Sequence, residues 1–136
     1  MYFKVLITIF LSLNLYANTL AVIVSQKSNI NTISEKELSR IFLSKTKSFP
    51  NGQKSITIEL NNEKYQSIFY KKISNKNLKQ LKKYWLKMIF TGLAMPPKKV
   101  NSIPMLIDFI KANPNAISYI PIEHVNETTK IIMEIK

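Results

Sequence analysis

The residues that could carry out catalysis are few and widely spaced along this chain. His124 is the only histidine, and no serine or acid stands in a spacing that ties it to that histidine as a triad. The eight acidic residues include no calcium-loop spacing, and cysteine is absent, which excludes disulfides, thiolate metal sites and cysteine nucleophiles. Gly52 and Gly92, the only glycines, lie too far apart to form a phosphate loop. The sequence therefore predicts a protein that is not an enzyme and that holds no cofactor or metal.

Polar side chains at the ends of predicted strands are better placed for binding than for catalysis. In an open parallel sheet, ligands bind beyond the carboxyl ends of the strands. The polar candidates at or near three such ends are Ser25, Asn61, Asn62, Lys64 and Ser118. The junction between the second strand and the next helix is the best position, because free amides there and the Lys64 ammonium could hold an anion. The alternative is that Asn61 and Asn62 only cap the helix.

These candidates require a framework of alternating strands and helices. Apolar runs and period-two alternation predict strands at 20–24, 55–60, 116–121 and 130–135. Helical periodicity and capping residues predict helices from Ser34 to about Lys45, at 63–73, from Asn75 or Asn77 to Gly92, and from Ser102 to Asn113. A chain of 136 residues suffices for one ordinary domain. We therefore expect a single α/β domain with a mostly parallel central sheet flanked by helices.

The longest predicted helix should organise the packing. Its apolar residues recur at spacings of three and four and so share one face, while most of its lysines lie on the other side. That apolar face consists of Leu78, Leu81, Trp85, Met88 and Ile89. Gly92 is suited to a left-handed helix end, and Pro96-Pro97 prevents any return to helix.

The formal net charge of +12 gives two readings of the surface. A cationic surface attracts anions, acidic lipids or nucleic acid. An AT-rich coding background would give the same abundance of Lys, Asn and Ile. Only Arg40 is an arginine, which argues against bidentate recognition of phosphates or bases. We therefore expect no nucleic-acid partner.

The first 17 residues resemble a secretory signal peptide. Lys4 precedes a short apolar run at 5–13, and Ala17 offers a cleavage site. An uncleaved membrane anchor is the rival interpretation, because apolar residues continue to Val24, but Asn14 and Asn18 interrupt them. The sequence thus predicts export to the periplasm, a mature domain at 18–136, and membrane contact only through the segment before cleavage.

Two regions of the chain resemble the phosphate ABC transporter substrate-binding proteins. The apolar strand at 20–24 and the segment Ser34–Lys45 are similar to the opening of a lobe in that family, with Ser44 in place of the usual glycine and Phe49 in place of a tryptophan. The segments 84–100 and 113–121 resemble the small single-domain members, which carry YW…FTG…PP..V and PGAIGYVP. The resemblance implies one lobe of a periplasmic-binding-protein-like (type II) fold.

The resemblance leaves two hypotheses for function. The first is capture of phosphate or another small anion for uptake or sensing. The second is an adaptor that binds no solute and contacts a periplasmic or inner-membrane protein. The loop after the second strand lacks the family's glycines and hydroxyls, Glu59 and Glu63 should repel phosphate, and Ser118 replaces a glycine. These departures favour the adaptor, whereas the resemblance itself favours the binder.

Overall fold

The computed structural model describes residues 18–136, so the predicted signal peptide at 1–17 lies outside the described residues. The elements in chain order are β1 (Leu20–Ser25), α1 (Glu35–Phe42), β2 (Ile56–Leu60), α2 (Glu63–Ser74), α3 (Leu78–Phe90), β3 (Lys98–Val100), α4 (Ile103–Ala112), β4 (Ala116–Pro121), the 3-10 turn η1 (Ile122–His124) and β5 (Thr129–Ile135). The eight elements that the sequence predicts are all present. Only the short β3 and η1 were not predicted.

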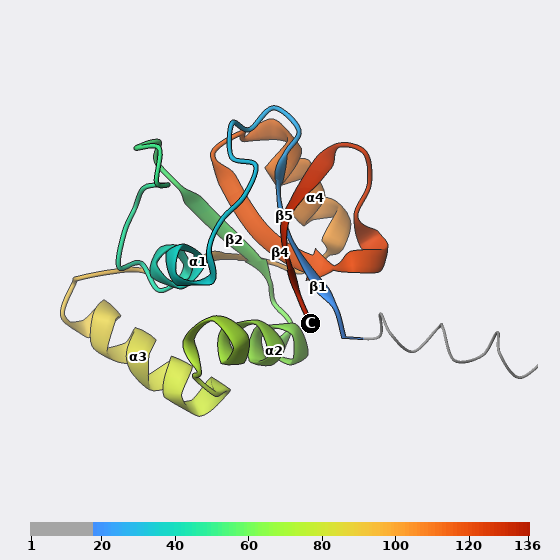
Figure 1. Cartoon of the computed structure of the whole chain (residues 1–136). Helices are drawn as coiled ribbons and strands as arrows, with labels where there is room; N and C mark the ends of the chain where they lie inside the picture. Colours follow the sequence, from blue (N-terminus) through green and yellow to red (C-terminus); the bar gives the residue numbers. More distant parts are fainter. Residues whose placement is uncertain (1–17) are drawn as a thin grey trace, which may run out of the picture.

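The strands form one mixed sheet in the order β3-β2-β4-β1-β5 (Figure 1). β2 is parallel to both β3 and β4, while β1 is antiparallel to both β4 and β5. Four strands therefore point one way, and β1 alone opposes them. The predicted fold class, an α/β domain with a central sheet flanked by helices, is confirmed.

Each face of the sheet has its own apolar cluster, as strand alternation requires. Along β4, Ile117 and Tyr119 face the cluster that contains α1, α2 and α3, whereas Ala116 and Ile120 face the cluster that contains α4. α1 and α2 thus cover one face and α4 covers the other (Figure 1). β1 is buried along its whole length, which explains its uninterrupted apolar run.

Aromatic rings fill the space between the sheet and the α1–α2 layer. Phe69 is stacked on Tyr119 with ring centroids 3.7 Å apart, and Phe42 meets the Phe69 ring edge-on at 4.8 Å. Phe42, Phe69, Tyr70 and Tyr119 are fully buried. Such geometry adds to the stability that area burial alone supplies.

The helix ends follow the capping residues seen in the sequence. Ser34 and Glu37 form the predicted capping box of α1, and Asn77, rather than Asn75, caps α3. Gly92 has the expected positive φ of 68° beyond the end of α3. α1 ends at Phe42, before the predicted end near Lys45, because the chain turns at Ser44, whose φ is 54°. Ser44 thus occupies a left-handed conformation where the resembling family has glycine.

α3 lies at the periphery and packs mainly on α2 (Figure 1). Leu81 and Trp85 are buried against the core as predicted, but Ile89 is 47% exposed. The prediction that Ile89 faces the core was wrong because the last turn of α3 extends past the body of the domain. Among residues 18–136, no helix is long and apolar enough to cross a bilayer.

Candidate functional site

A cavity of about 730 Å³ opens at the carboxyl edge of β2, β3 and β4. Leu60 ends β2, Asn101 follows β3, and His124 follows β4, so three strand ends meet there. We call it the asparagine cavity; its lining is Leu60, Asn61, Asn62, Tyr65, Asn101, Ile103, Pro104, Ile107, Asp108, His124 and Asn126. Ligands bind at this kind of edge in open α/β sheets.

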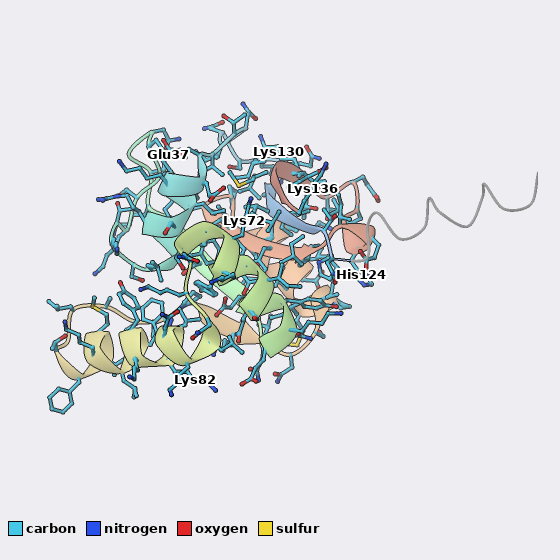
Figure 2. All side chains as sticks on the ribbon, turned by 60° about the horizontal axis from the view of Figure 1, so that its bottom comes forward. Glu37, Lys72, Lys82, His124, Lys130 and Lys136 are labelled. Carbon is cyan, nitrogen blue, oxygen red and sulfur yellow. The ribbon has the colours of Figure 1, made fainter. Side chains whose placement is uncertain are left out.

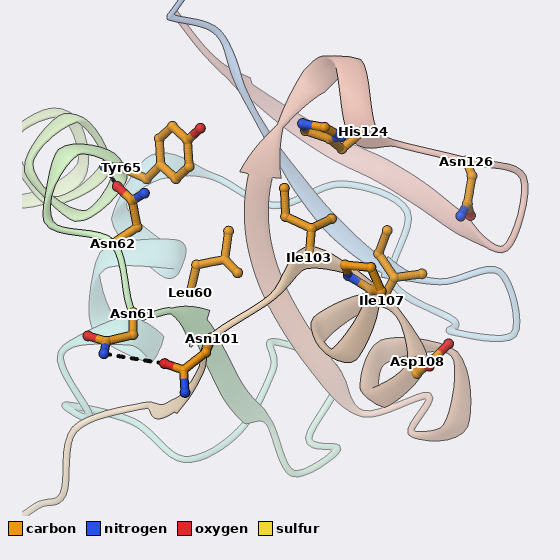
Figure 3. A pocket seen from close by; sticks show the side chains of 11 residues that line it. Leu60, Asn61, Asn62, Tyr65, Asn101, Ile103, Ile107, Asp108, His124 and Asn126 are labelled. Atoms are coloured by element: carbon orange, nitrogen blue, oxygen red, sulfur yellow. Dashed lines mark hydrogen bonds between the residues drawn. The ribbon is translucent and has the colours of Figure 1, made fainter.

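The lining combines an apolar floor with polar walls. Tyr65 of α2 and His124 stand on opposite sides, with Leu60 and Ile103 between them (Figure 3). The Asn61 amide group donates a hydrogen bond to the Asn101 Oδ1 at 3.4 Å, which ties the end of β2 to the end of β3. Asn62 and Asn126 add two more side-chain amides, which can both donate and accept, and Tyr65, Asp108 and His124 are the other polar residues of the lining. The cavity can therefore hydrogen-bond a small polar solute.

Two helices begin at this cavity. Asn62 is the N-cap of α2 and Ser102 is the N-cap of α4; each accepts, with its side chain and carbonyl, N–H groups of the first turn. The second residue of α4 is a proline and has no N–H. Within residues 18–136, the amide N–H groups of Glu63, Lys64 and Ile103 find no acceptor. The positive ends of two helix dipoles are thus directed at one cavity.

The charges of the lining are sparse. Asp108 is the only acid of the lining, which contains no lysine or arginine. No group of three potential metal ligands exists among residues 18–136. The lining therefore offers several hydrogen-bonding groups and little charge of its own.

Two of the five predicted ligand-binding residues, Asn61 and Asn62, line the cavity. Asn62 also caps α2 by accepting the Tyr65 N–H at 3.1 Å, so capping and cavity lining coexist. Lys64 lies in the exposed first turn of α2, outside the lining.

The structure places Ser25 and Ser118 away from the asparagine cavity. Because β1 is antiparallel, Ser25 pairs with Thr129 at the opposite edge of the sheet, where it lines a separate cavity of about 350 Å³. Ser118 lies in the middle of β4 beside Ile23, fully buried, and its hydroxyl has no hydrogen-bond partner within residues 18–136. The expectation that Ser25 shares an edge with Asn61 and Asn62 rested on a parallel β1, whereas Ser118 misses that edge because it lies in the middle of its strand.

Glu59 does not face the cavity, contrary to the prediction that it would repel an anion there. Its side chain points to the α2 side of the sheet, where it is 2% exposed and accepts hydrogen bonds from the Tyr119 hydroxyl at 2.6 Å and the Tyr70 hydroxyl at 3.1 Å. Burial raises the pKa of the Glu59 carboxyl, and the tyrosine hydrogen bonds oppose that rise. Burial also raises the pKa of Tyr70 and Tyr119 well above the usual tyrosine value.

Glu63 is exposed and lies 3.4 Å from the Lys82 ammonium of α3. It does not line the cavity. The electrostatic objection to an anion therefore rests on Asp108 rather than on the two glutamates.

Sequence reasoning missed Tyr65, Asn101, His124 and Asn126 as cavity residues. One signal could have revealed Asn101, namely a second junction between a strand and a helix. There, Val100 and Asn101 precede the Ser102 cap of α4, just as Leu60 and Asn61 precede the Asn62 cap of α2. The three-residue β3 was too short and too rich in lysine to be recognised, so this symmetry was not visible.

Comparison with solved structures identifies similar folds. The chain resembles a candidate phosphate ABC transporter substrate-binding protein from Clostridium perfringens, solved with bound phosphate, with a TM-score of 0.65 and 11% identity over 83% of this chain and 43% of that one. It resembles an ABC-type phosphate transport receptor from Vibrio cholerae with a TM-score of 0.61 and 16% identity over 84% and 45% of the two chains. It also resembles PstS from Borrelia burgdorferi, with a TM-score of 0.53 and 19% identity over 75% of this chain and 40% of that one.

These likenesses show the fold and no more, because the identities are low. The chain spans less than half the length of each of these structures. No protein-family model and no curated protein sequence matches it. The likeness confirms the fold that the sequence resemblance implied, a single α/β domain similar to part of these phosphate-transport proteins.

Proposed function

We propose that this domain is a secreted, single-lobe solute-binding module that binds a small anion, such as phosphate, in the asparagine cavity. The observation that carries the proposal is the meeting of three strand ends and two helix N-termini at one cavity of about 730 Å³. Phosphate transport proteins of similar fold support the choice of ligand class.

The physical argument for an anion rests on the helix ends and on net charge. The amide N–H of Ile103, which lines the cavity, can donate to an anion, and the dipoles of α2 and α4 favour negative charge at their N-termini. The exposed Lys64 ammonium adds a point charge in the first turn of α2, next in sequence to the lining residue Tyr65, and the large excess of lysine over acidic residues attracts anions from a distance. Because Glu59 faces the other side of the sheet, it does not oppose such binding.

The affinity should be low. Asp108 lies in the lining, the lining contains no arginine to clamp an oxyanion, and the cavity is open on one side. We expect a Kd on the order of 1 mM, equivalent to about 4 kcal/mol. A module of this kind would act in uptake or sensing together with a periplasmic or inner-membrane protein.

The test is isothermal titration calorimetry with inorganic phosphate on the wild type and on Asn62→Asp. Aspartate caps a helix as well as asparagine does, so this variant should remain folded while it adds a negative charge to the cavity. Phosphate binding should fall at least about tenfold, since a like charge nearby opposes the anion. The matched control is Asn77→Asp, the same change at the N-cap of α3, away from the cavity.

A second pair of variants tests whether a lysine charge near the start of α2 contributes to phosphate binding. Lys64→Ala should weaken phosphate binding, whereas Lys98→Ala on β3, whose ammonium lies 4.9 Å from the centre of the Phe109 ring, should not. Equal binding by the wild type and Asn62→Asp would place the anion elsewhere. Absence of phosphate binding at 10-fold the expected Kd, about 10 mM, would overturn the proposal and leave the adaptor hypothesis.

Export is tested separately. N-terminal sequencing of the protein from a periplasmic fraction should find a chain that begins near Asn18. A chain that retains Met1, or one embedded in the membrane, would contradict cleavage of the segment 1–17.

A further inference from the structure

The far end of α3 exposes an unusual concentration of large apolar side chains. The exposed fractions are 94% for Phe90, 70% for Met95, 69% for Leu86, 67% for Leu93 and 47% for Ile89. We call these five residues the α3 tip. They make up most of the exposed large apolar side chains of residues 18–136, and clusters of this kind usually mark an interaction surface.

The tip is formed by local geometry that is well defined. Leu86 and Phe90 are four residues apart, so they lie on one side of α3, away from the buried Leu81 and Trp85. Gly92, with φ of 68°, then turns the chain so that Leu93 and Met95 follow directly beyond the helix end.

Hydrogen bonds hold this arrangement to the body of the domain. The Ser44 hydroxyl donates to the Met95 carbonyl at 3.0 Å, and the Tyr84 hydroxyl donates to the Leu43 carbonyl at 2.5 Å. Within the helix end itself, the Thr91 hydroxyl donates to the Lys87 carbonyl at 2.7 Å. The apolar groups are therefore displayed on a fixed helix end.

The same helix is strongly cationic. α3 contains Lys79, Lys82, Lys83 and Lys87 and no acidic residue. Lys82 projects from α3 in Figure 2 and lies 3.4 Å from the Glu63 carboxylate, an exposed pair that solvent screens. Within residues 18–136, the other three have no ion-pair partner. An exposed apolar tip is thus flanked by unneutralised positive charge.

The apolar tip and the neighbouring lysines together indicate which kind of surface could cover the tip. A second copy of the chain would bring the lysines of two α3 helices together, and like charges repel. The core of a protein–protein interface is depleted in lysine. An anionic bilayer accepts both features, because apolar side chains enter the interfacial region while lysines meet the lipid headgroups.

We propose that the α3 tip docks this domain on the surface of an anionic phospholipid bilayer. Phe90, Leu93 and Met95 enter the headgroup boundary, and Lys79, Lys83 and Lys87 contact the acidic headgroups. The asparagine cavity lies at the sheet edge, and its lining contains no residue of the tip. This interaction is independent of the anion proposal and concerns a different surface.

The first test uses a fluorescent probe at a chosen position. The chain has no cysteine, so Leu93→Cys can be labelled uniquely with an environment-sensitive dye. The matched control is Met105→Cys on α4, where the side chain is also exposed, at 57%. Both proteins keep the whole chain, so any contribution of residues 1–17 to binding is common to them.

Vesicles of phosphatidylglycerol and phosphatidylethanolamine are then compared with vesicles of phosphatidylcholine. The dye at residue 93 should shift to the blue and become shielded from iodide only with the phosphatidylglycerol vesicles, while the dye at residue 105 stays accessible. Equal accessibility at both positions, or equal shielding by both vesicle types, would overturn the proposal. Shielding without vesicles that rises with protein concentration would assign the tip to a second copy instead.

The second test separates charge from apolar contact in vesicle binding. Lys79→Gln/Lys83→Gln should weaken binding about 25-fold, because each lysine near an anionic surface contributes about a fivefold factor. The control Lys36→Gln/Lys54→Gln makes the same net change elsewhere and should weaken binding no more than about twofold. Phe90→Ser should weaken it about tenfold or more. An α3 double variant that behaves like its control would refute docking through this helix.

Discussion

The buried Glu59 carboxyl offers a sharp test of how the core is held together. It accepts hydrogen bonds from Tyr119, Tyr70 and, at 3.4 Å, the Gln66 side-chain amide. The perturbation is Glu59→Leu, which keeps the approximate volume and removes every acceptor. Two tyrosine hydroxyls would then be buried with no partner.

The magnitude follows from these contacts. An orphaned buried hydroxyl costs about 1–3 kcal/mol, so two of them cost roughly 2–6 kcal/mol. The Gln66 amide adds little, because it also lies 3.4 Å from the Leu60 carbonyl. Removing a desolvated carboxyl returns part of the cost. We expect Glu59→Leu to lower the free energy of unfolding by about 2–4 kcal/mol.

The assay is urea denaturation of this variant and of the triple variant Glu59→Leu/Tyr70→Phe/Tyr119→Phe. Removing both hydroxyls together with their acceptor leaves no unpaired group, so the triple variant should regain at least half of the lost stability. In the wild-type background, by contrast, Tyr70→Phe/Tyr119→Phe should destabilise, because it deprives the carboxyl of its donors. If the tyrosine changes destabilise equally in both backgrounds, the three groups are not a coupled network and the reasoning fails.

Three further predictions concern stability. Because burial raises the pKa of Glu59, the folded state keeps the proton after the unfolded chain has released it. The free energy of unfolding should therefore fall as pH rises from the unfolded pKa near 4.5 through the raised folded pKa. Glu59→Gln should remove this pH-dependent component from denaturation curves measured across that range. Identical pH profiles for the wild type and the variant would disprove the role of Glu59. Trp85→Ala should cost about 3–5 kcal/mol in chemical denaturation, because the indole is nearly buried and meets the Tyr84 ring edge-on at 5.0 Å; a loss under about 1 kcal/mol would show that it is not a core residue. Ser34→Ala should cost about 1 kcal/mol by breaking the capping box with Glu37, whereas Thr32→Ala, at an exposed position in the preceding loop, should change thermal stability by less than about 0.5 kcal/mol; equal effects would deny the cap a role.

Local signals in the sequence predicted most of the elements. The helix N-caps could be predicted because a short polar side chain just before helical periodicity is a signal contained within a few residues. The four predicted caps that the structure shows are Ser34, Asn62, Asn77 and Ser102. β3 was missed because Lys98 and Lys99 are exposed and only Val100 is buried. Its existence depends on pairing with β2, which lies far away in the sequence.

The candidate site depended on strand direction, which no local pattern encodes. Asn61 and Asn62 reach the asparagine cavity because β2 leads directly into α2 there. Ser25 lies at the other edge because β1 is antiparallel to its neighbours, whereas the sequence led us to expect a parallel strand. The direction of the Glu59 side chain could not be predicted from the sequence either. Both faces of β2 are buried at its carboxyl end, so the alternation of side chains along the strand does not show toward which helix layer Glu59 points.

The antiparallel position of β1 affects the order in which the chain can fold. This strand comes first in the described chain, yet both of its neighbours come last, with Leu20 paired to Pro121 on one side and to Ile135 on the other. During synthesis or translocation, the apolar run Leu20–Val24 has no partner in the sheet until residues 116–135 are available. Contacts between such distant segments close slowly. The most apolar strand of the described chain therefore waits for its sheet partners until nearly the last residue has been made.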